Sequence, residues 1–95
     1  MLMMQEVLSR TGESKLPLQD RVYYELRLYD SESAGEPVCC VRQARAHWDE
    51  ESQEMARDEV SVEAFATLKE AKERYAERRL ALAQKGFTDS DMDLF

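Results

Sequence analysis

The sequence has few of the residues from which catalytic and cofactor sites are usually built. It contains one histidine, His47, and three scattered glycines, which excludes a glycine-rich phosphate-binding loop. Neither cysteine lies in a context that would activate a nucleophile, and no apolar pocket is indicated around any pair of carboxylates. We therefore expect a protein that is not an enzyme and that needs no cofactor.

Long apolar runs are also missing. No segment approaches the roughly 18 apolar residues of a membrane span, and residues 1–6 lack the basic start of a signal peptide. Cys39 and Cys40 are adjacent, so on a strand their side chains point to opposite faces and a disulfide between them is not expected. Free thiols without a leader predict a cytoplasmic protein that makes no membrane contact. A metal or thiol-redox role for these cysteines with His47 is the alternative.

Basic residues are outnumbered, 13 against 20 acidic ones, and the net charge is −7. The excess lies in two segments: residues 49–59 carry six acids against Arg57 alone, and residues 88–95 carry three aspartates and no base. The rest of the chain is close to neutral. A basic footprint for non-specific nucleic-acid binding is therefore absent, whereas the acidic segments favour contacts with proteins.

Two periodicities predict the fold of what is, at 95 residues, a single domain. Residues 21–29 alternate between an apolar face and a mixed one, which is typical of a half-buried strand. Residues 38–45 form the second strand of a hairpin with a long polar loop, 30–37, and residues 55–65 form another strand. Residues 3–9 fit either a helical turn or an irregular first strand, and residues 54–57 a strand or a helical turn.

Thr67 to Lys85 is the best-marked element, an amphipathic helix. Thr67 and Glu70 fit a capping box, and Gly86 stands where a helix commonly ends. The apolar stripe consists of Leu68, Ala71, Tyr75 and Leu82, with Leu80 close to it. We therefore predict an α+β fold, a small antiparallel sheet of about four strands packed on one face by a long C-terminal helix. The domain spans residues 1–87, and a flexible acidic tail spans 88–95.

Arginines are the charged residues with the clearest potential for binding. Arg74, Arg78 and Arg79 lie along the helix, and three more, Arg27, Arg42 and Arg45, lie on predicted strands. If they converge, they form a small site for a phosphate or for a partner's acidic patch. The alternative is that they pair with nearby acids as solvated surface. The only tryptophan, Trp48, either covers the edge of the core or anchors a partner.

The order of these pieces resembles the WGR domain. The resemblance rests on residues 23–28 (YYELRL), on 65–71 (FATLKEA) and on the helix end at 84–87 (QKGF), and it covers roughly residues 21–87. It implies an antiparallel sheet with a packed helix and a nucleic-acid-binding role. The Trp-Gly-Arg signature is replaced by Gln-Ala-Arg at 43–45. In such a degenerate WGR-type domain the nucleic-acid contacts would be Arg45, Arg74, Arg78 and Arg79.

The C-terminus carries a second resemblance. Residues 91–95 (DMDLF) are similar to the short peptides with which bacterial proteins dock on the DNA polymerase sliding clamp, with aspartate in place of the favoured first glutamine. It implies a partner associated with DNA replication or repair, held by Met92, Leu94 and Phe95. The alternative is that Leu94 and Phe95 pack on their own domain or on a second copy in a homodimer. Our main hypothesis is a small cytoplasmic, bacterial protein-interaction or adaptor module.

Overall fold

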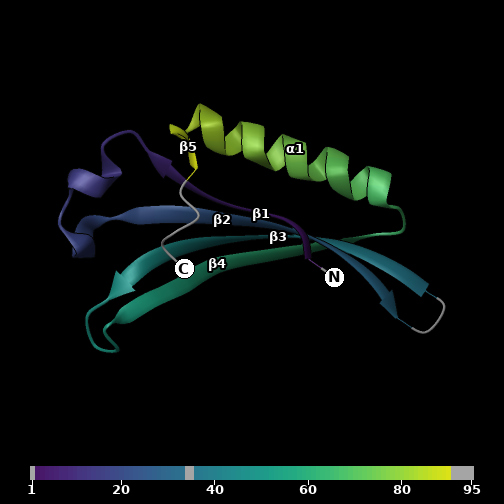
Figure 1. Ribbon diagram of the computed structural model, residues 1–95, viewed down its shortest axis with the longest axis horizontal. Helices are drawn as coiled ribbons and strands as arrows, with labels where there is room; N and C mark the ends of the chain where they lie inside the picture. The colour runs from purple at the N-terminus through teal and green to yellow at the C-terminus, as the bar shows by residue number, and fades with distance from the viewer. Residues whose placement is uncertain (1, 34–35, 91–95) are drawn as a thin grey trace.

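The computed structural model describes residues 2–33 and 36–90. Its five strands form one antiparallel sheet in the order β4-β3-β2-β1-β5, and the α-helix lies across one face of it (Figure 1). The α+β class is confirmed, with one strand more than predicted. The elements are β1 (Leu2–Arg10), the 3-10 helices η1 (Glu13–Lys15) and η2 (Leu18–Asp20), β2 (Val22–Ser33), β3 (Glu36–Asp49), β4 (Glu54–Phe65), α1 (Leu68–Gln84) and β5 (Phe87–Ser90).

The hairpin of β2 and β3 is longer than predicted. Its register runs without a shift from the pair of Val22 and His47 to the pair of Ser33 and Glu36. The long polar loop predicted over residues 30–37 is therefore wrong. Strand pairing here depends on main-chain hydrogen bonds, which polar residues form as well as apolar ones, so the loss of hydrophobic alternation did not mark the end of the strands.

The structure also resolves the two segments left open between helix and strand. Residues 2–10 form β1, which pairs with β2 on one side and β5 on the other, and residues 54–57 belong to β4. The sheet continues past the predicted domain boundary, because residues 88–90 lie in β5 and Phe87 pairs with Arg10. Residues 91–95 of the predicted tail lie outside the described residues.

A bulge interrupts β4. Gln43 of β3 pairs with Ser61 and Arg45 pairs with Asp58, so two residues of β4, Glu59 and Val60, lie opposite one residue of β3. Glu59 has the left-handed φ of 49°. A bulge bends a strand and shifts the alternation of its side chains by one residue. In agreement, the sheet is curved, with its ends bending away from α1 (Figure 1).

The helix begins and ends as predicted. The Thr67 hydroxyl accepts a hydrogen bond of 3.3 Å from the amide of Glu70, and Gly86, with φ 97°, follows the last turn. Ala71, Tyr75 and Leu82 are buried on the sheet. Leu80 is not part of this stripe, because it lies about 140° around the helix from Tyr75. No described helix combines the length and apolar character needed to cross a bilayer.

The main core lies between α1 and the sheet. Phe87 closes one end, as expected from its place after the helix, and its ring packs edge-on against Tyr24 with 4.7 Å between centroids. A second, smaller cluster lies on the other face of the sheet and consists of Val7, Tyr23 and Ala46 with the partly buried Met55. The buried residues of the main core are Leu8, Leu26, Leu28, Cys39, Val41, Ala71, Tyr75, Leu82 and Phe87.

Two leucines of α1 provide a matched test of this packing. Leu82 is 1% exposed and Leu80 is 61% exposed. We expect Leu82→Ala to lower the free energy of unfolding by about 2–5 kcal/mol, because it opens a cavity in the core. Leu80→Ala should change it by less than about 0.5 kcal/mol. Urea denaturation followed by circular dichroism measures both, and equal effects would contradict the orientation of α1.

Candidate functional site

The two faces of the sheet differ in what covers them. One face is covered by α1. Apart from η1 and η2, which lie at one end of the sheet, no described element packs on the opposite face (Figure 1). We call this second surface the open face. Strand register and alternation place the following residues on it: Val7, Tyr23, Glu25, Arg27, Tyr29, Cys40, Arg42, Ala44, Ala46, Trp48, Met55, Arg57, Val62 and Ala64.

Three arginines from three strands converge on one carboxylate in the open face. Arg42 Nη1 donates to Oε1 of Glu25 at 2.6 Å, and Arg57 donates to Oε2 from Nη2 at 3.1 Å and from Nε at 3.3 Å. Arg27 Nη2 donates to Oε2 at 3.2 Å, and its Nε lies 3.2 Å from Oε1 without making a hydrogen bond. Glu25 with Arg27, Arg42 and Arg57 is called the arginine cluster below.

The arginine cluster carries more positive than negative charge. Its three guanidinium groups and one carboxylate have a formal charge of +2. The Glu25 side chain is fully buried, while the arginine side chains keep 23–30% of their surface exposed. Glu59 is exposed in the bulge opposite Ala44, and Glu50 and Glu51 lie in the turn at the end of this face. Within the described residues, the arginines are thus the main charged groups at the centre of the open face, although the chain as a whole is acidic.

A tyrosine extends the cluster along β2. Arg27 Nη1 donates to the Tyr29 hydroxyl at 3.0 Å. This hydrogen bond and the charge of Glu25 raise the pKa of Arg27, although burial of the guanidinium acts in the opposite direction. Arg27 therefore stays protonated, and its fork is held between two partners in the plane of the open face.

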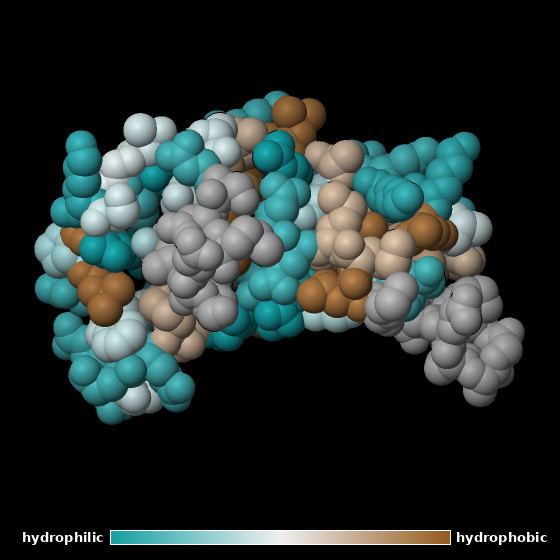
Figure 2. Space-filling view, viewed as in Figure 1, coloured by the Kyte–Doolittle hydropathy of each residue, from teal (hydrophilic) through white to brown (hydrophobic). Residues whose placement is uncertain are grey.

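Apolar side chains flank the cluster. Val62 of β4 pairs with Arg42 and is 60% exposed, and Trp48 pairs with Met55 near the turn between β3 and β4, both of them half-buried. Trp48 thus lies on the open face and pairs with a residue that contacts the smaller cluster. Seen from the side, the apolar areas of the surface are small and separated by polar ones (Figure 2). The open face therefore offers guanidinium donors with apolar contacts beside them.

The four arginines predicted for a nucleic-acid site lie on the other side of the sheet and are paired with acids. Arg74 and Arg78 both contact Glu63 of β4, and Arg78 also donates to Gln43 and Ser61. The hydrogen bond from Arg78 and the two positive charges lower the pKa of Glu63. The remaining two contact separate acids, Arg79 with Glu6 at 2.9 Å and Arg45 with Asp58 at 3.4 Å.

These pairs connect the helix to the sheet. Glu6 of β1 accepts hydrogen bonds from both Arg79 and the hydroxyl of Tyr75, each at 2.9 Å. Burial and the neighbouring Glu6 raise the pKa of Tyr75 well above its ordinary value. Arg78 and Arg79 reach toward opposite sides of the helix, to β4 and to β1. The helix arginines therefore do not converge into one anion site.

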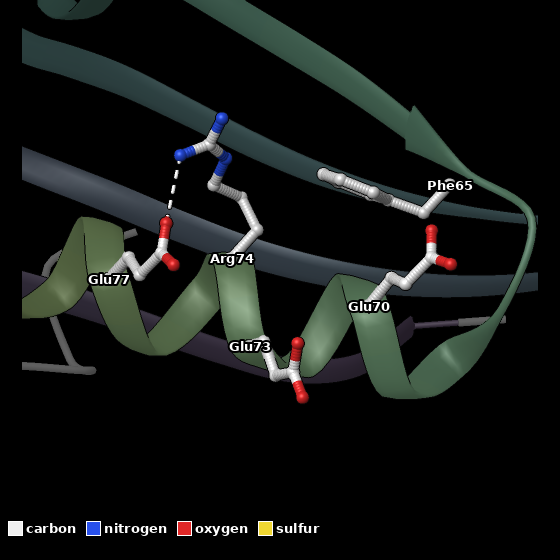
Figure 3. A pocket seen from close by; sticks show the side chains of 5 residues that line it. All are labelled: Phe65, Glu70, Glu73, Arg74 and Glu77. Carbon is white, nitrogen blue, oxygen red and sulfur yellow. Dashed lines mark hydrogen bonds and ion pairs between the residues drawn. The ribbon is translucent and has the colours of Figure 1, made fainter.

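A shallow hollow lies between α1 and the end of β4. Figure 3 shows Arg74 between two glutamates of α1, with the ring of Phe65 at one end. Arg74 donates to Glu77 at 2.8 Å and also contacts Glu63. Because acidic residues dominate the lining and its only arginine is paired, this hollow is solvated surface. Its lining residues are Phe65, Glu70, Glu73, Arg74 and Glu77.

The cysteines and His47 lie apart. Cys39 is buried against α1, where burial and the nearby Asp30 raise its pKa, so its thiol stays protonated. Cys40 points to the open face, as the alternation predicted. His47 Nδ1 lies 3.7 Å from Asp58. Within residues 2–33 and 36–90, no three histidine, cysteine or acidic side chains are grouped as a metal site.

Sequence reasoning named Arg27 and Arg42 as potential anion ligands but missed Glu25 and Arg57. The spacing of Glu25 and Arg27, two residues apart on one strand face, was a usable signal. The sequence around Arg57 gives no such signal, because Arg57 is the only basic residue of an acidic segment. Met92, Leu94 and Phe95, the remaining predicted contacts, lie outside the described residues. A comparison with known protein families, curated proteins and solved structures finds no match for this chain.

Removing the central carboxylate tests the cluster. We expect Glu25→Gln to lower the free energy of unfolding by up to about 3 kcal/mol, because three half-buried guanidinium groups lose the carboxylate that they share. Added sulfate should restore part of this loss, since an anion that binds only the folded state stabilises it. Glu73→Gln, at an exposed position of α1, is the control and should change stability by less than about 0.5 kcal/mol. A variant as stable as the wild type would show that Glu25 does not organise the arginines.

Proposed function

We propose that this chain is a small, non-enzymatic, cytoplasmic interaction module that binds an acidic segment of a partner protein on its open face. One observation carries the proposal. Arg27, Arg42 and Arg57 surround a single buried carboxylate on the open face, and the side chains of Arg27 and Arg42 keep 26% and 23% of their surface exposed there. Glutamate and aspartate side chains of a partner would pair with the exposed guanidinium surface of Arg27 and Arg42 in the two-pronged geometry that arginine favours.

The surroundings of the arginine cluster favour a protein segment. Arginine and aromatic residues are enriched in protein interfaces, and the open face brings Trp48 and Tyr29 to the two sides of the cluster. The exposed Val62 beside Arg42 adds an apolar contact. An extended segment with alternating acidic and apolar residues would meet both kinds of group as it crosses the strands.

Charge argues against a nucleic acid as the main ligand. The net charge of −7 repels a polyanion at long range, and the turn between β3 and β4 carries Glu50 and Glu51 at the end of the open face. The same repulsion is weaker for a short acidic peptide, because it carries fewer charges and contacts only the arginine cluster. Nucleic-acid binding of the WGR type is therefore the alternative function, and the oligonucleotide experiment below tests it.

The C-terminal residues supply a second proposed contact, which makes the module an adaptor. Met92, Leu94 and Phe95 resemble the apolar part of a clamp-binding peptide. The chain would then hold one partner on the open face and another through residues 91–95. A homodimer in which the apolar pair packs on a second copy is the competing arrangement.

A matched pair of charge insertions tests the open face. Val62 is 60% exposed beside Arg42, and Leu80 is 61% exposed on α1. The probe is a short peptide in which glutamate alternates with tyrosine, and NMR shift mapping should place it on β2, β3 and β4. Val62→Asp should weaken this peptide about fivefold, since a carboxylate near Arg42 competes with the ligand by roughly 1 kcal/mol. Leu80→Asp should leave the affinity unchanged.

Three results would oppose the proposal: shifts confined to α1, equal effects of the two variants, or tighter binding of the same peptide with lysine in place of glutamate. A single-stranded oligonucleotide that binds more tightly than the acidic peptide would favour the nucleic-acid role. Its affinity should then fall steeply with added salt.

The C-terminal contact has its own test. Purified bacterial sliding clamp is mixed with the whole chain, and affinity is measured by surface plasmon resonance. The double substitution Leu94→Ala, Phe95→Ala should abolish binding while the thermal unfolding curve stays the same, because the lost contacts are with the clamp. Substitution of Asp91 by Gln should strengthen binding, since it restores the favoured first residue. Binding that survives the double substitution would exclude the motif.

A further inference from the structure

We infer that the open face binds the chain's own C-terminal segment, residues 91–95, which an acidic partner must displace. The inference rests on the proposed function, since it concerns the regulation of the same surface. It is carried by the place where β5 ends, by the number of residues that follow β5 and by their charges.

β5 ends beside the arginine cluster. Ser90 pairs with Leu8 of β1, and Leu8 pairs with Tyr24 of β2, the residue before Glu25. Two strand spacings therefore separate Ser90 from β2, which is about 10 Å. β5 runs antiparallel to β1, so its direction leads from the level of Tyr24 toward the levels of Glu25 and Arg27. The last described residue thus lies close to the cluster, at the end of a strand directed along it.

The C-terminal segment is long enough to reach the arginines. Arg27 lies three residues along β2 from Tyr24, which together with the two strand spacings places its Cα about 14 Å from that of Ser90. Five extended residues span up to about 17 Å. No element of the described residues lies over this path, because β5 pairs with β1 only at Leu8–Arg10, and η1 and η2 follow Arg10 in the other direction.

Charge favours this occupant. Residues 88–95 carry three aspartates and no base, and two of them, Asp91 and Asp93, belong to the C-terminal segment. On the open face, Arg42 makes one side-chain hydrogen bond within the described residues, from Nη1, and its side chain is 23% exposed. The Arg27 side chain is 26% exposed. The remaining N–H groups of Arg42 are therefore donors for an aspartate of the segment.

The pattern of the segment fits the same surface. The open face brings guanidinium donors together with apolar contacts, which suits a chain that alternates acidic and apolar residues. Residues 91–95 read Asp-Met-Asp-Leu-Phe and have this alternation. Because the segment is attached to Ser90, its effective concentration at the cluster is of the order of millimolar, so contacts that would hold a free peptide only weakly are sufficient.

Occupancy of the open face links the two contacts of the adaptor. The C-terminal segment cannot lie on the open face and in the groove of a clamp at the same time. A partner that captures Leu94 and Phe95 therefore releases the arginine cluster for an acidic segment. The effect is reciprocal, since an acidic partner on the open face makes the C-terminal segment available to the clamp by the same factor.

Removal of the two aspartate charges tests the occupancy. The double substitution Asp91→Asn, Asp93→Asn in the whole chain should tighten binding of the glutamate–tyrosine peptide at least about threefold, because a site that is free about one third of the time binds about threefold more weakly. The control, Glu70→Gln with Glu73→Gln, removes the same charge from exposed positions of α1. It should change the affinity less than about 1.5-fold, since distant charges are screened by salt. NMR titration measures both affinities.

Spectra of the free chains locate the contact. The aspartate variant should differ from the wild type at the amides of β2 and β3 around Arg27 and Arg42. These differences should stay constant over an about tenfold range of protein concentration, because the contact is intramolecular. Differences confined to residues 87–95 would overturn the inference. Differences that grow with concentration would overturn it in favour of a second copy.

The outcomes separate the inference from the proposed function. If the acidic peptide binds the open face of the wild type and of the aspartate variant equally, the inference is wrong and the interaction role stands. If the open-face signals of the two free chains differ but the peptide binds neither, the inference holds and the acidic-partner role is wrong. If the signals agree and the peptide binds neither chain, both are wrong.

Discussion

The ion pairs around Glu25 connect the side chains of three neighbouring strands through one carboxylate. A buried carboxylate is costly unless its oxygens are hydrogen-bonded, and here Arg27, Arg42 and Arg57 satisfy both of them. The same contacts prevent the arginines from extending into solvent and hold them near one another in spite of their mutual repulsion. The character of the open face therefore depends on a residue that has no exposed surface.

The two faces of the sheet balance their charges differently. On the helix side, each of four arginines, three on α1 and Arg45 on β3, has a carboxylate at ion-pair distance, supplied by Glu6, Asp58 or Glu63. On the open face the described ion pairs join three arginines to one carboxylate, that of Glu25. The net charge of the chain therefore does not describe either face, because the described arginines and acids are distributed differently over the two.

The elements that local side-chain patterns define were predictable, and those that depend on pairing were not. Alternation over residues 21–29 predicted a strand, and the threonine cap with the terminal glycine predicted the helix to within one residue at each end. The outer part of the β2–β3 hairpin and the short β5 are held by main-chain bonds to a neighbour, which composition does not record. Leu80 was placed near the stripe by its type and lies on the exposed side of the helix.

The candidate site was also not predictable in full, because it depends on how β4 pairs with β3. Arg57 and Val62 are five residues apart, so in a regular strand they would point to opposite faces. The bulge at Glu59 shifts the alternation by one residue and brings both to the open face. A glutamate with positive φ gives no glycine signal by which such a bulge is recognised in a sequence. Arg57 was therefore not predicted to join the cluster because its orientation depends on the bulge, which the sequence does not indicate.

The position of β5 has a consequence for the order in which the molecule assembles. Leu8 pairs with Ser90, so β1 receives its second neighbour from residues that are synthesised after those of every other strand. The buried residues of α1 and Phe87 likewise follow the four strands whose apolar side they cover. During synthesis Leu26, Leu28 and Val41 therefore stay without their final partners until the helix has left the ribosome. Because contacts so distant in sequence form slowly, this interval is the stage at which the chain is most prone to aggregate.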